Sequence, residues 1–212
     1  IFDIASGTWS EGPSGPVSRS EPSVVASSDR IYFMGGRGQN WETLDSLDIY
    51  VPGSAQWLEG TKSPRGRYGH SAVLFGEKMY VYGGRSDDPL SPATDAMDVY
   101  DLASGTWDTL PGGGGLRSGH SAVVFSEKMW ILGGTQNGVV VYDFVEKTWS
   151  NPQFLELVIK EGDAIAFADQ LVLLGGIDRL GQVVDKVTVL STAPLGVNSS
   201  RELLEPRAQH TS

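Results

Sequence analysis

The sequence predicts an all-β protein of the β-propeller type, in which short four-stranded sheets stack radially. The first observation is a repeat, because an apolar run that ends in two glycines occurs four times. Its copies are "RIYFMGG" at 30–36, "KMYVYGG" at 78–84, "KMWILGG" at 128–134 and "QLVLLGG" at 170–176. The second observation is that the intervening runs are β-rich and divided by Gly, Pro, Ser and Asp, without long helical periodicity. Because such short strands cannot bury both faces alone, the sheets must stack on their neighbours, and radial stacking gives a propeller.

Two further series place the remaining strands of each repeat. The first strand is expected in "RYGHSAVLF" at 67–75 and "RSGHSAVVF" at 117–125. The third and fourth strands are expected in "SLDIYVPGSAQW" at 46–57, "AMDVYDLASGTW" at 96–107 and "GVVVYDFVEKTW" at 138–149. Each recurring Trp offers a large apolar body to pack between sheets and an indole N–H that needs an acceptor.

We expect one domain over 1–212, with repeats near 16–60, 61–112, 113–153 and 154–204 and partial units at 1–15 and 205–212. The first residues, "IFDIASGTW", match the end of the repeat, and the last, "RAQHTS", match its beginning. The fourth unit departs from the pattern, since "KVTVLSTAPLGVNSS" has neither Tyr-Asp nor Trp. We therefore expect either part of a larger propeller or an imperfectly closed five-bladed one. The start without Met favours a piece of a longer chain.

The composition narrows the classes of function. The chain has 212 residues, of which 40% are hydrophobic, so it can form a real core. It has no cysteine, which excludes a disulfide framework, a thiolate nucleophile and a Cys-ligated metal. Its net charge of -10 argues against nucleic acid or an anionic membrane as a partner. No apolar stretch is long enough to span a membrane, and we expect a cytoplasmic location.

The repeat resembles that of a known family. A double glycine after an apolar strand, followed by Tyr-Asp and then Trp at a period near 50 residues, is similar to the kelch repeat, and "RSGHS" at 117–121 strengthens the match. The resemblance covers nearly the whole chain and implies a kelch-type β-propeller, of which this sequence holds four recognisable blades and parts of a fifth; kelch relatives commonly close with six or seven. Kelch propellers include scaffolds, ubiquitin-ligase adaptors, oxidases and lyase-like specifier proteins, so the fold alone does not fix the function.

Two sets of arginines recur in the repeats. One set precedes the inner strand and the other directly follows a double glycine. In adaptor-type kelch domains, arginines at matching positions face the mouth of the central channel and grip acidic peptides by bidentate pairing. The resemblance therefore implies the candidate ligand-binding residues Arg19, Arg67, Arg117 and Arg207 of the first set and Arg37 and Arg85 of the second. The alternative is that each Arg bonds loop carbonyls and packs against the next blade.

The loop "GRGQNWETLD" at 36–45 adds Trp41 to the candidate residues. An exposed Trp41 beside Arg37 would form a stacking and charge-pairing anchor of the kind found at interface centres. The alternative is a Trp that covers the edge of its own blade. In the later units Thr135 and Ile177 replace the arginine after the double glycine, so a ligand surface of this kind is one-sided.

Metal and catalytic sites are not expected. His70, His120 and His210 recur at equivalent positions, but equivalent residues lie on different blades, so we expect each to be a structural histidine bonded inside its blade. A galactose-oxidase-like copper site needs a cysteine bonded to tyrosine, and the chain has none. No Ser/His/Asp constellation can be nominated. We expect no enzyme activity and no cofactor.

These observations favour a protein–protein interaction module, a scaffold or adaptor that binds a protein or an acidic peptide through loops on one face. The alternative is a segment of a carbohydrate-binding or carbohydrate-oxidising propeller whose catalytic residues lie outside this chain.

Overall fold

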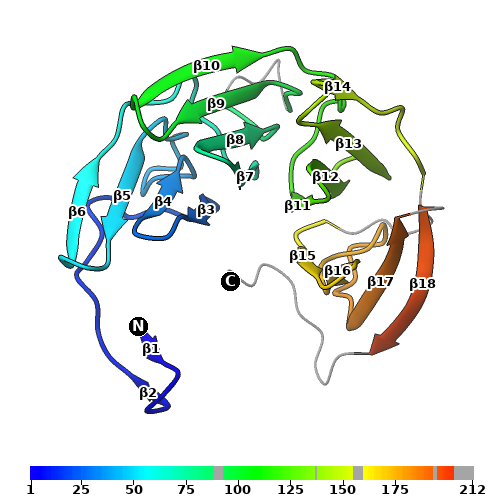
Figure 1. Cartoon of the computed structure of the whole chain (residues 1–212), viewed down its shortest axis with the longest axis horizontal. Helices are drawn as coiled ribbons and strands as arrows, with labels where there is room; N and C mark the ends of the chain where they lie inside the picture. The colour runs from blue at the N-terminus through cyan, green and yellow to red at the C-terminus, as the bar shows by residue number, and fades with distance from the viewer. Residues whose placement is uncertain (88–92, 137, 155–159, 193–194, 203–212) are drawn as a thin grey trace.

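The chain folds into a β-propeller arrangement of four blades (Figure 1). The computed structural model describes residues 1–87, 93–136, 138–154, 160–192 and 195–202, with side chains omitted for 195–202. This part of the chain contains strands and no helix, which confirms the predicted all-β class. None of it forms a helix with the length and apolar character needed to cross a membrane.

Each blade is a four-stranded antiparallel sheet whose strands follow one another in the sequence. Blade 1 consists of β3 (Ser23–Ala26), β4 (Ile31–Met34), β5 (Leu47–Val51) and β6 (Gln56–Glu59). Blade 2 consists of β7 (Ser71–Phe75), β8 (Lys78–Tyr82), β9 (Met97–Asp101) and β10 (Thr106–Leu110). Blade 3 consists of β11 (His120–Phe125), β12 (Lys128–Gly133), β13 (Val139–Asp143) and β14 (Thr148–Trp149). Blade 4 consists of β15 (Asp163–Phe167), β16 (Gln170–Leu174), β17 (Lys186–Thr192) and β18 (Leu195–Glu202).

The first strand of every blade lies innermost, and the blades stack side by side around the centre (Figure 1). Alternate residues of the second strand point to opposite faces of the sheet, so an apolar run supplies both neighbouring interfaces. Tyr32 and Met34 of blade 1 pack against Met79 and Val81 of blade 2. Similar clusters join blade 2 to blade 3 and blade 3 to blade 4. The core of this protein is therefore the series of interfaces between blades.

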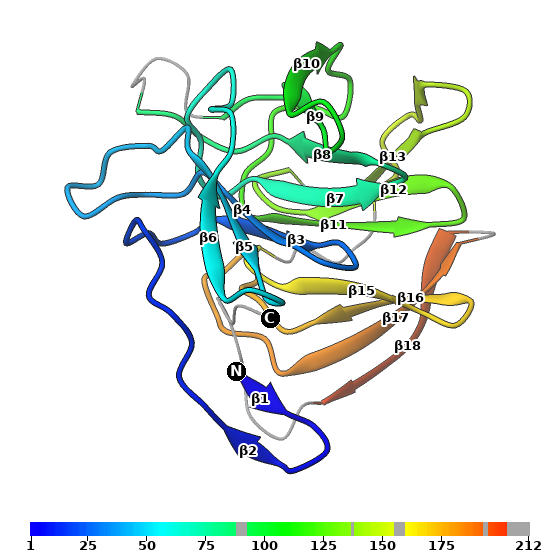
Figure 2. The same cartoon turned by 60° about the vertical axis from the view of Figure 1, so that its left-hand side comes forward.

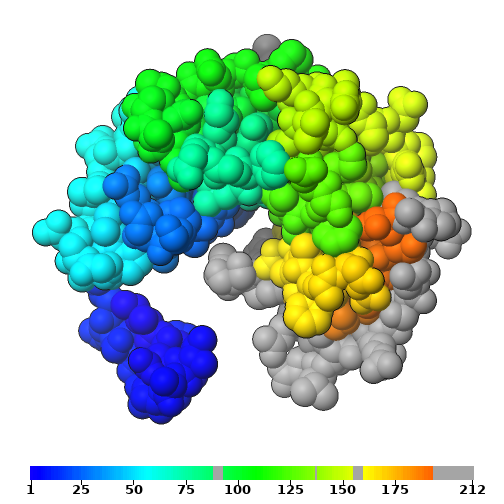
Figure 3. Space-filling model, viewed as in Figure 1, coloured from blue at the N-terminus to red at the C-terminus, as the bar shows by residue number. Residues whose placement is uncertain are grey.

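A separate hairpin precedes blade 1. It consists of β1 (Phe2–Asp3) and β2 (Thr8–Trp9), and pairs Phe2 with Trp9. This register matches the third and fourth strands of the complete blades, where Tyr50 pairs with Trp57. Figure 3 shows the hairpin beyond blade 1, at one end of the arc that the blades form.

The double glycine makes the junction between one blade and the next. Gly35 and Gly36 both have positive φ, and the N–H of Gly36 donates to the carbonyl of Arg67 at 2.8 Å. A Cβ at Gly35 would lie 2.6 Å from that same carbonyl oxygen, so only glycine fits. The equivalent bond runs from Gly84 to Arg117 at 2.7 Å. The second strand of each of these blades thus ends against the chain that starts the following blade.

The recurring tryptophans fasten the chain that enters each blade. The indole N–H groups of Trp57, Trp107 and Trp149 donate to the carbonyls of Pro13, Thr61 and Pro111, respectively. Each ring also packs on the tyrosine opposite it on the neighbouring strand, with ring centroids 5.0–5.1 Å apart. The expected acceptor for the indole is therefore a backbone carbonyl of the connecting segment.

Blade 4 forms its outer strand pair without this Tyr–Trp contact. Strands β17 and β18 pair along their length, with a register shift between Val189 and Leu190. The partial unit expected at 205–212 lies outside the described residues, and so does Arg207.

Candidate interaction surface

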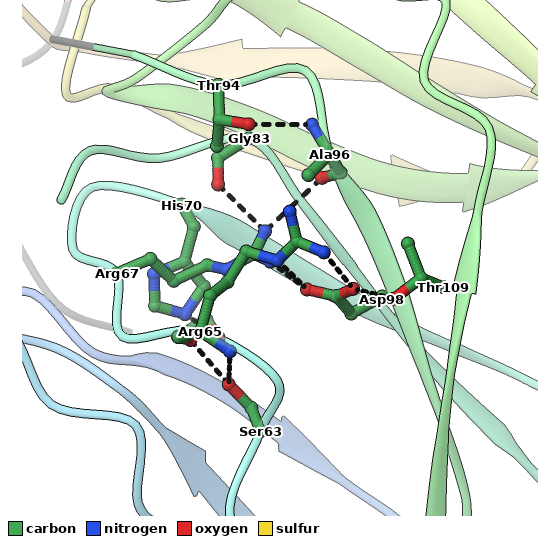
Figure 4. A network of polar contacts seen from close by, with 10 residues as sticks. Ser63, Arg65, Arg67, His70, Gly83, Thr94, Ala96, Asp98 and Thr109 are labelled. Carbon is green, nitrogen blue, oxygen red and sulfur yellow. Dashed lines mark hydrogen bonds and ion pairs between the residues drawn. The ribbon is translucent and has the colours of Figure 1, made fainter. Parts of the chain in front are cut away.

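The arginine that precedes the inner strand is buried inside its own blade. Arg67 is only 1% exposed, and its Nη1 donates to the carbonyls of Gly83 and Ala96 at 2.9 and 3.2 Å. Its Nη2 pairs with Asp98, which also accepts bonds from Arg65 and Thr109 (Figure 4). The guanidinium therefore closes the double-glycine turn from within. Burial is the main cause that lowers the pKa of Arg67, to about 10, with a smaller effect from Arg65, while Asp98 opposes the shift.

Arg19 and Arg117 repeat this arrangement in blades 1 and 3. Arg19 donates to the carbonyl of Gly35 at 2.9 Å and pairs with Asp48. Arg117 is 0% exposed and donates to the carbonyls of Gly114, Gly133 and Gly138 at 3.0 Å. Blade 3 has Val140 where blades 1 and 2 have the aspartate, and within the described residues the guanidinium of Arg117 donates to carbonyl oxygens.

The positions of Arg19, Arg67 and Arg117 agree with the alternative in which each arginine bonds loop carbonyls of its own blade. Their donors already bond the carbonyls of the blade, and no more than 7% of the Arg19 side chain is exposed. A role in the scaffold is therefore our prediction for these three arginines, and a stability measurement tests it.

The repeated histidines join neighbouring blades. Nε2 of His70 lies 2.9 Å from the hydroxyl of Ser23, and Nε2 of His120 lies 2.8 Å from the hydroxyl of Ser71. Each contact links the start of one blade to the inner strand of the preceding blade, so the bond runs between blades and not inside one. In blade 4, Gly162 replaces the histidine, and Ser121 donates directly to its carbonyl at 2.5 Å. Among the described residues no group of three or more His, Asp or Glu side chains is arranged to hold a metal ion.

The loop between β4 and β5 (Figure 2) carries Arg37, an arginine of the second set, whose surroundings differ from those of the first set. The guanidinium carbon of Arg37 lies 3.6 Å from the ring centroid of Tyr68, which belongs to the segment entering blade 2. Its Nη1 donates to the carbonyl of Trp41 at 2.7 Å, and the ring of Trp41 is 5.8 Å away. Stacking of this kind orients an arginine while leaving its edge available for hydrogen bonds. Its side chain is 19% exposed, so it is accessible at the rim of the loop.

Asp87 of blade 2 fastens this loop from the other side of the blade boundary. Its Oδ2 accepts bonds from the backbone N–H and the hydroxyl of Thr43, at 2.6 and 2.7 Å. Its Oδ1 lies 4.0 Å from Nη1 of Arg37. The bonds from Thr43 are the main cause that lowers the pKa of Asp87, and the charge of Arg37 adds to the shift. The loop of blade 1 is thus held in place by blade 2.

Arg85 lies next to the same tyrosine. Its backbone exchanges two hydrogen bonds with Tyr68, at 2.9 and 3.0 Å, while Arg37 stacks on the ring of Tyr68. The Nε of Arg85 is buried and has no hydrogen-bond partner within the part of the chain that the structure describes. Arg37, Trp41, Tyr68, Arg85 and Asp87 therefore form one continuous group, which we call the blade 1–2 loop surface.

Sequence reasoning included three of these five residues and missed the roles of Tyr68 and Asp87. Tyr68 stands where blades 1 and 3 have Ser20 and Ser118 and blade 4 has Lys160, and an aromatic residue at this position was the available signal. A second signal, for the scaffold role of the buried arginines, was the aspartate in "SLDIY" and "AMDVY". These aspartates, Asp48 and Asp98, are the charge partners of Arg19 and Arg67.

Four antiparallel four-stranded blades with buried arginines at their junctions define this molecule as a repeat β-propeller. A family model described as the KLHDC2/KLHL20/DRC7 Kelch-repeats domain matches residues 1–176 and, in a second alignment, residues 56–212. The chain therefore belongs to the kelch-repeat family, whose domains are generally non-catalytic interaction modules that commonly bind proteins. No curated protein matches the chain.

Proposed function

We propose that this propeller binds a protein partner through an acidic peptide segment at the blade 1–2 loop surface. The observation that carries the proposal is the stack in which Arg37 lies on Tyr68 and beside the exposed Trp41. A guanidinium fixed on an aromatic face loses little conformational freedom when it pairs with a carboxylate. Loops on a rigid scaffold are also the usual position of binding residues in repeat proteins.

The same geometry gives each residue a role. Arg37 and Arg85 would pair with carboxylates of the peptide, and Trp41 would supply apolar contact area. Asp87 and Thr43 would keep the loop in the bound shape before the partner arrives, which reduces the ordering cost of binding. The chain itself carries no chemistry in this proposal, and the cytoplasmic location that we expect stays a prediction.

Replacing Arg37 and Arg85 together by alanine tests the proposal. We expect binding of acidic synthetic peptides to weaken by about tenfold or more, because each lost charge-assisted bond is worth on the order of 1.5–3 kcal/mol. We also expect the wild-type affinity to fall as salt rises, since exposed charge pairs are screened. Affinities measured by calorimetry at two salt concentrations check both expectations.

Arg30→Ala is the matched control, because Arg30 precedes β4 whereas Arg37 follows it, so the two lie at opposite ends of that strand. It removes one positive charge from the blade that carries Arg37 and should leave peptide affinity unchanged. If only net charge matters, this control loses about half of the binding free energy that the double variant loses, because it removes one charge and not two. Failure of wild-type protein to bind any acidic peptide would refute the proposed ligand class.

A further inference from the structure

Trp41 has a backbone conformation that a bulky residue rarely adopts. Its φ is 65°, in the left-handed region where side chains other than glycine are strained. Among the non-glycine residues with positive φ in the described part of the chain, it is the only aromatic one; the others are Glu21, Ala55, Ser126, Glu127, Lys147, Glu161 and Ala168. Strain of this kind is retained mainly where the surrounding structure or a function demands it.

The equivalent loop of blade 4 indicates that the fold does not require a strained, non-glycine residue at the position of Trp41. Three hydrogen bonds define the loop of blade 1: Gly38 N–H to Glu42 O, Trp41 N–H to Gly38 O and Leu44 N–H to Gly36 O. Blade 4 repeats them as Asp178 N–H to Gln182 O, Gly181 N–H to Asp178 O and Val184 N–H to Gly176 O. Gly181, with φ 77°, therefore occupies the position of Trp41. The same turn forms with glycine, which removes the strain.

Packing does not explain the tryptophan either. Trp41 is 70% exposed, and its indole N–H donates to no group in the described residues. Trp9, Trp57, Trp107 and Trp149 each have an aromatic ring about 5 Å away within the described chain, whereas Trp41 has none. Within the described residues, the group that contacts its ring is the guanidinium of Arg37. The indole is thus held at the surface, beside a positive charge, and lacks the aromatic partner that those four tryptophans have.

We propose that Trp41 anchors the partner by stacking on an aromatic side chain that lies next to a carboxylate in the bound peptide. This inference rests on the proposed function and specifies its ligand. The aromatic ring of the peptide would pack on the exposed indole in an offset or edge-on arrangement. The neighbouring carboxylate would pair with Arg37, which lies beside the same indole. A rigid aromatic anchor of this kind gives contact area at low conformational cost.

Stability measurements decide whether Trp41 is kept at a cost to folding. We expect Trp41→Gly to melt at or above the wild-type temperature, because glycine relieves the left-handed strain. Trp41→Ala should melt below Trp41→Gly, because it keeps a Cβ at the same φ. A Trp41→Gly variant that melts clearly below wild type would show that the indole supports its blade, and would overturn the inference.

Binding measurements decide the ligand chemistry. The probes are three short synthetic peptides with a central Phe-Asp, Ala-Asp or Phe-Asn pair. We expect wild-type protein to prefer Phe-Asp, and Trp41→Gly to bind Phe-Asp about tenfold more weakly, the loss typical of an interface anchor. The control is Leu180→Ala, which truncates an exposed apolar side chain in the equivalent loop of blade 4 and should change nothing.

The outcomes separate this inference from the proposed function. If Trp41→Gly binds Phe-Asp within about twofold of wild type while the Arg37 and Arg85 double variant loses binding, the surface binds acidic peptides but Trp41 is not its anchor. If wild-type protein binds Ala-Asp as tightly as Phe-Asp, the proposal that Trp41 stacks on an aromatic side chain of the peptide is wrong. If it binds none of the three peptides, the ligand chemistry of both proposals is wrong.

Discussion

Arg67 and Arg37 both belong to sets of arginines that recur in the repeats, and yet they have opposite surroundings. Arg67 is enclosed by carbonyl oxygens and by Asp98, whereas Arg37 lies on the ring of Tyr68 at the rim of a loop. The difference arises because the side chain of Arg67 points into its blade, toward the double-glycine turn, whereas the side chain of Arg37 points away from the turn toward Tyr68. For Arg67 the charge is a structural element, and for Arg37 it is available to a partner.

Removing Arg67 should therefore damage the fold. We expect Arg67→Ala to lower the free energy of unfolding by about 3–5 kcal/mol, because the change takes the guanidinium donor away from the carbonyls of Gly83 and Ala96 and removes a buried charge partner of Asp98. Arg30→Ala, which removes an exposed charge, should change it by less than about 0.5 kcal/mol. Urea unfolding curves of the two variants, compared with wild type, measure both changes in the free energy of unfolding. Equal and small effects of the two substitutions would contradict the scaffold role of Arg67.

The sequence could identify these arginines as recurrent but could not say which way each one points. Both sets have regular spacing, and spacing carries no information on side-chain direction within an irregular turn. The direction depends on which carbonyls the double glycine leaves without donors, and this is a property of the folded junction between blades. The contribution of Asp87 to the loop of blade 1 depends in the same way on a contact across that junction.

At the scale of the strands, the sequence was far more informative. Apolar runs that end in two glycines place β4, β8, β12 and β16 directly. The Tyr and Trp of the third and fourth strands prove to be register partners, as in Tyr100 and Trp107. Blade 4 lacks this pair and still forms β17 and β18, because pairing of the backbone needs no particular side chain. The bonds that His70 and His120 make to preceding inner strands could not be derived, since they connect residues nearly one repeat apart.

These histidines should make stability depend on pH. Burial is the main cause that lowers the pKa of His120 to about 3 and the pKa of His70 well below its usual value, and Arg117 and Arg67 add to the respective shifts. Between the unfolded pKa near 6.5 and the folded values, the unfolded chain binds more protons, so stability is full above about pH 6.5 and falls as the pH decreases. The expected slope is about 1.4 kcal/mol per pH unit for each histidine.

Unfolding free energies measured from pH 7 down to about pH 4.5 test this expectation, because most carboxylates titrate below that range. Replacing both histidines by glutamine keeps a hydrogen-bonding side chain and removes the titration, so the slope should nearly vanish. A double variant with the same slope as wild type would contradict the assignment.

At the scale of the molecule, blade-to-blade packing creates a surface that no single repeat contains. Arg37, Trp41 and Thr43 come from blade 1, whereas Tyr68 and Asp87 come from the segment entering blade 2 and from its β8–β9 loop. Blades 3 and 4 have Thr135 and Ile177 after their double glycines, so they cannot present the same stack. The propeller arrangement therefore supplies rigid scaffolding, and the departures from the repeat supply the specific surface.

The most direct test of this account is the hydrogen-exchange footprint of a bound acidic peptide. A peptide with a central Phe-Asp pair should slow amide exchange in residues 36–45 and around Tyr68 and Arg85, and leave the equivalent loop of blade 4 at 176–184 unchanged. Protection confined to blades 3 and 4, or to the opposite ends of the strands around Arg30, would contradict the claim that the blade 1–2 loop surface binds the partner.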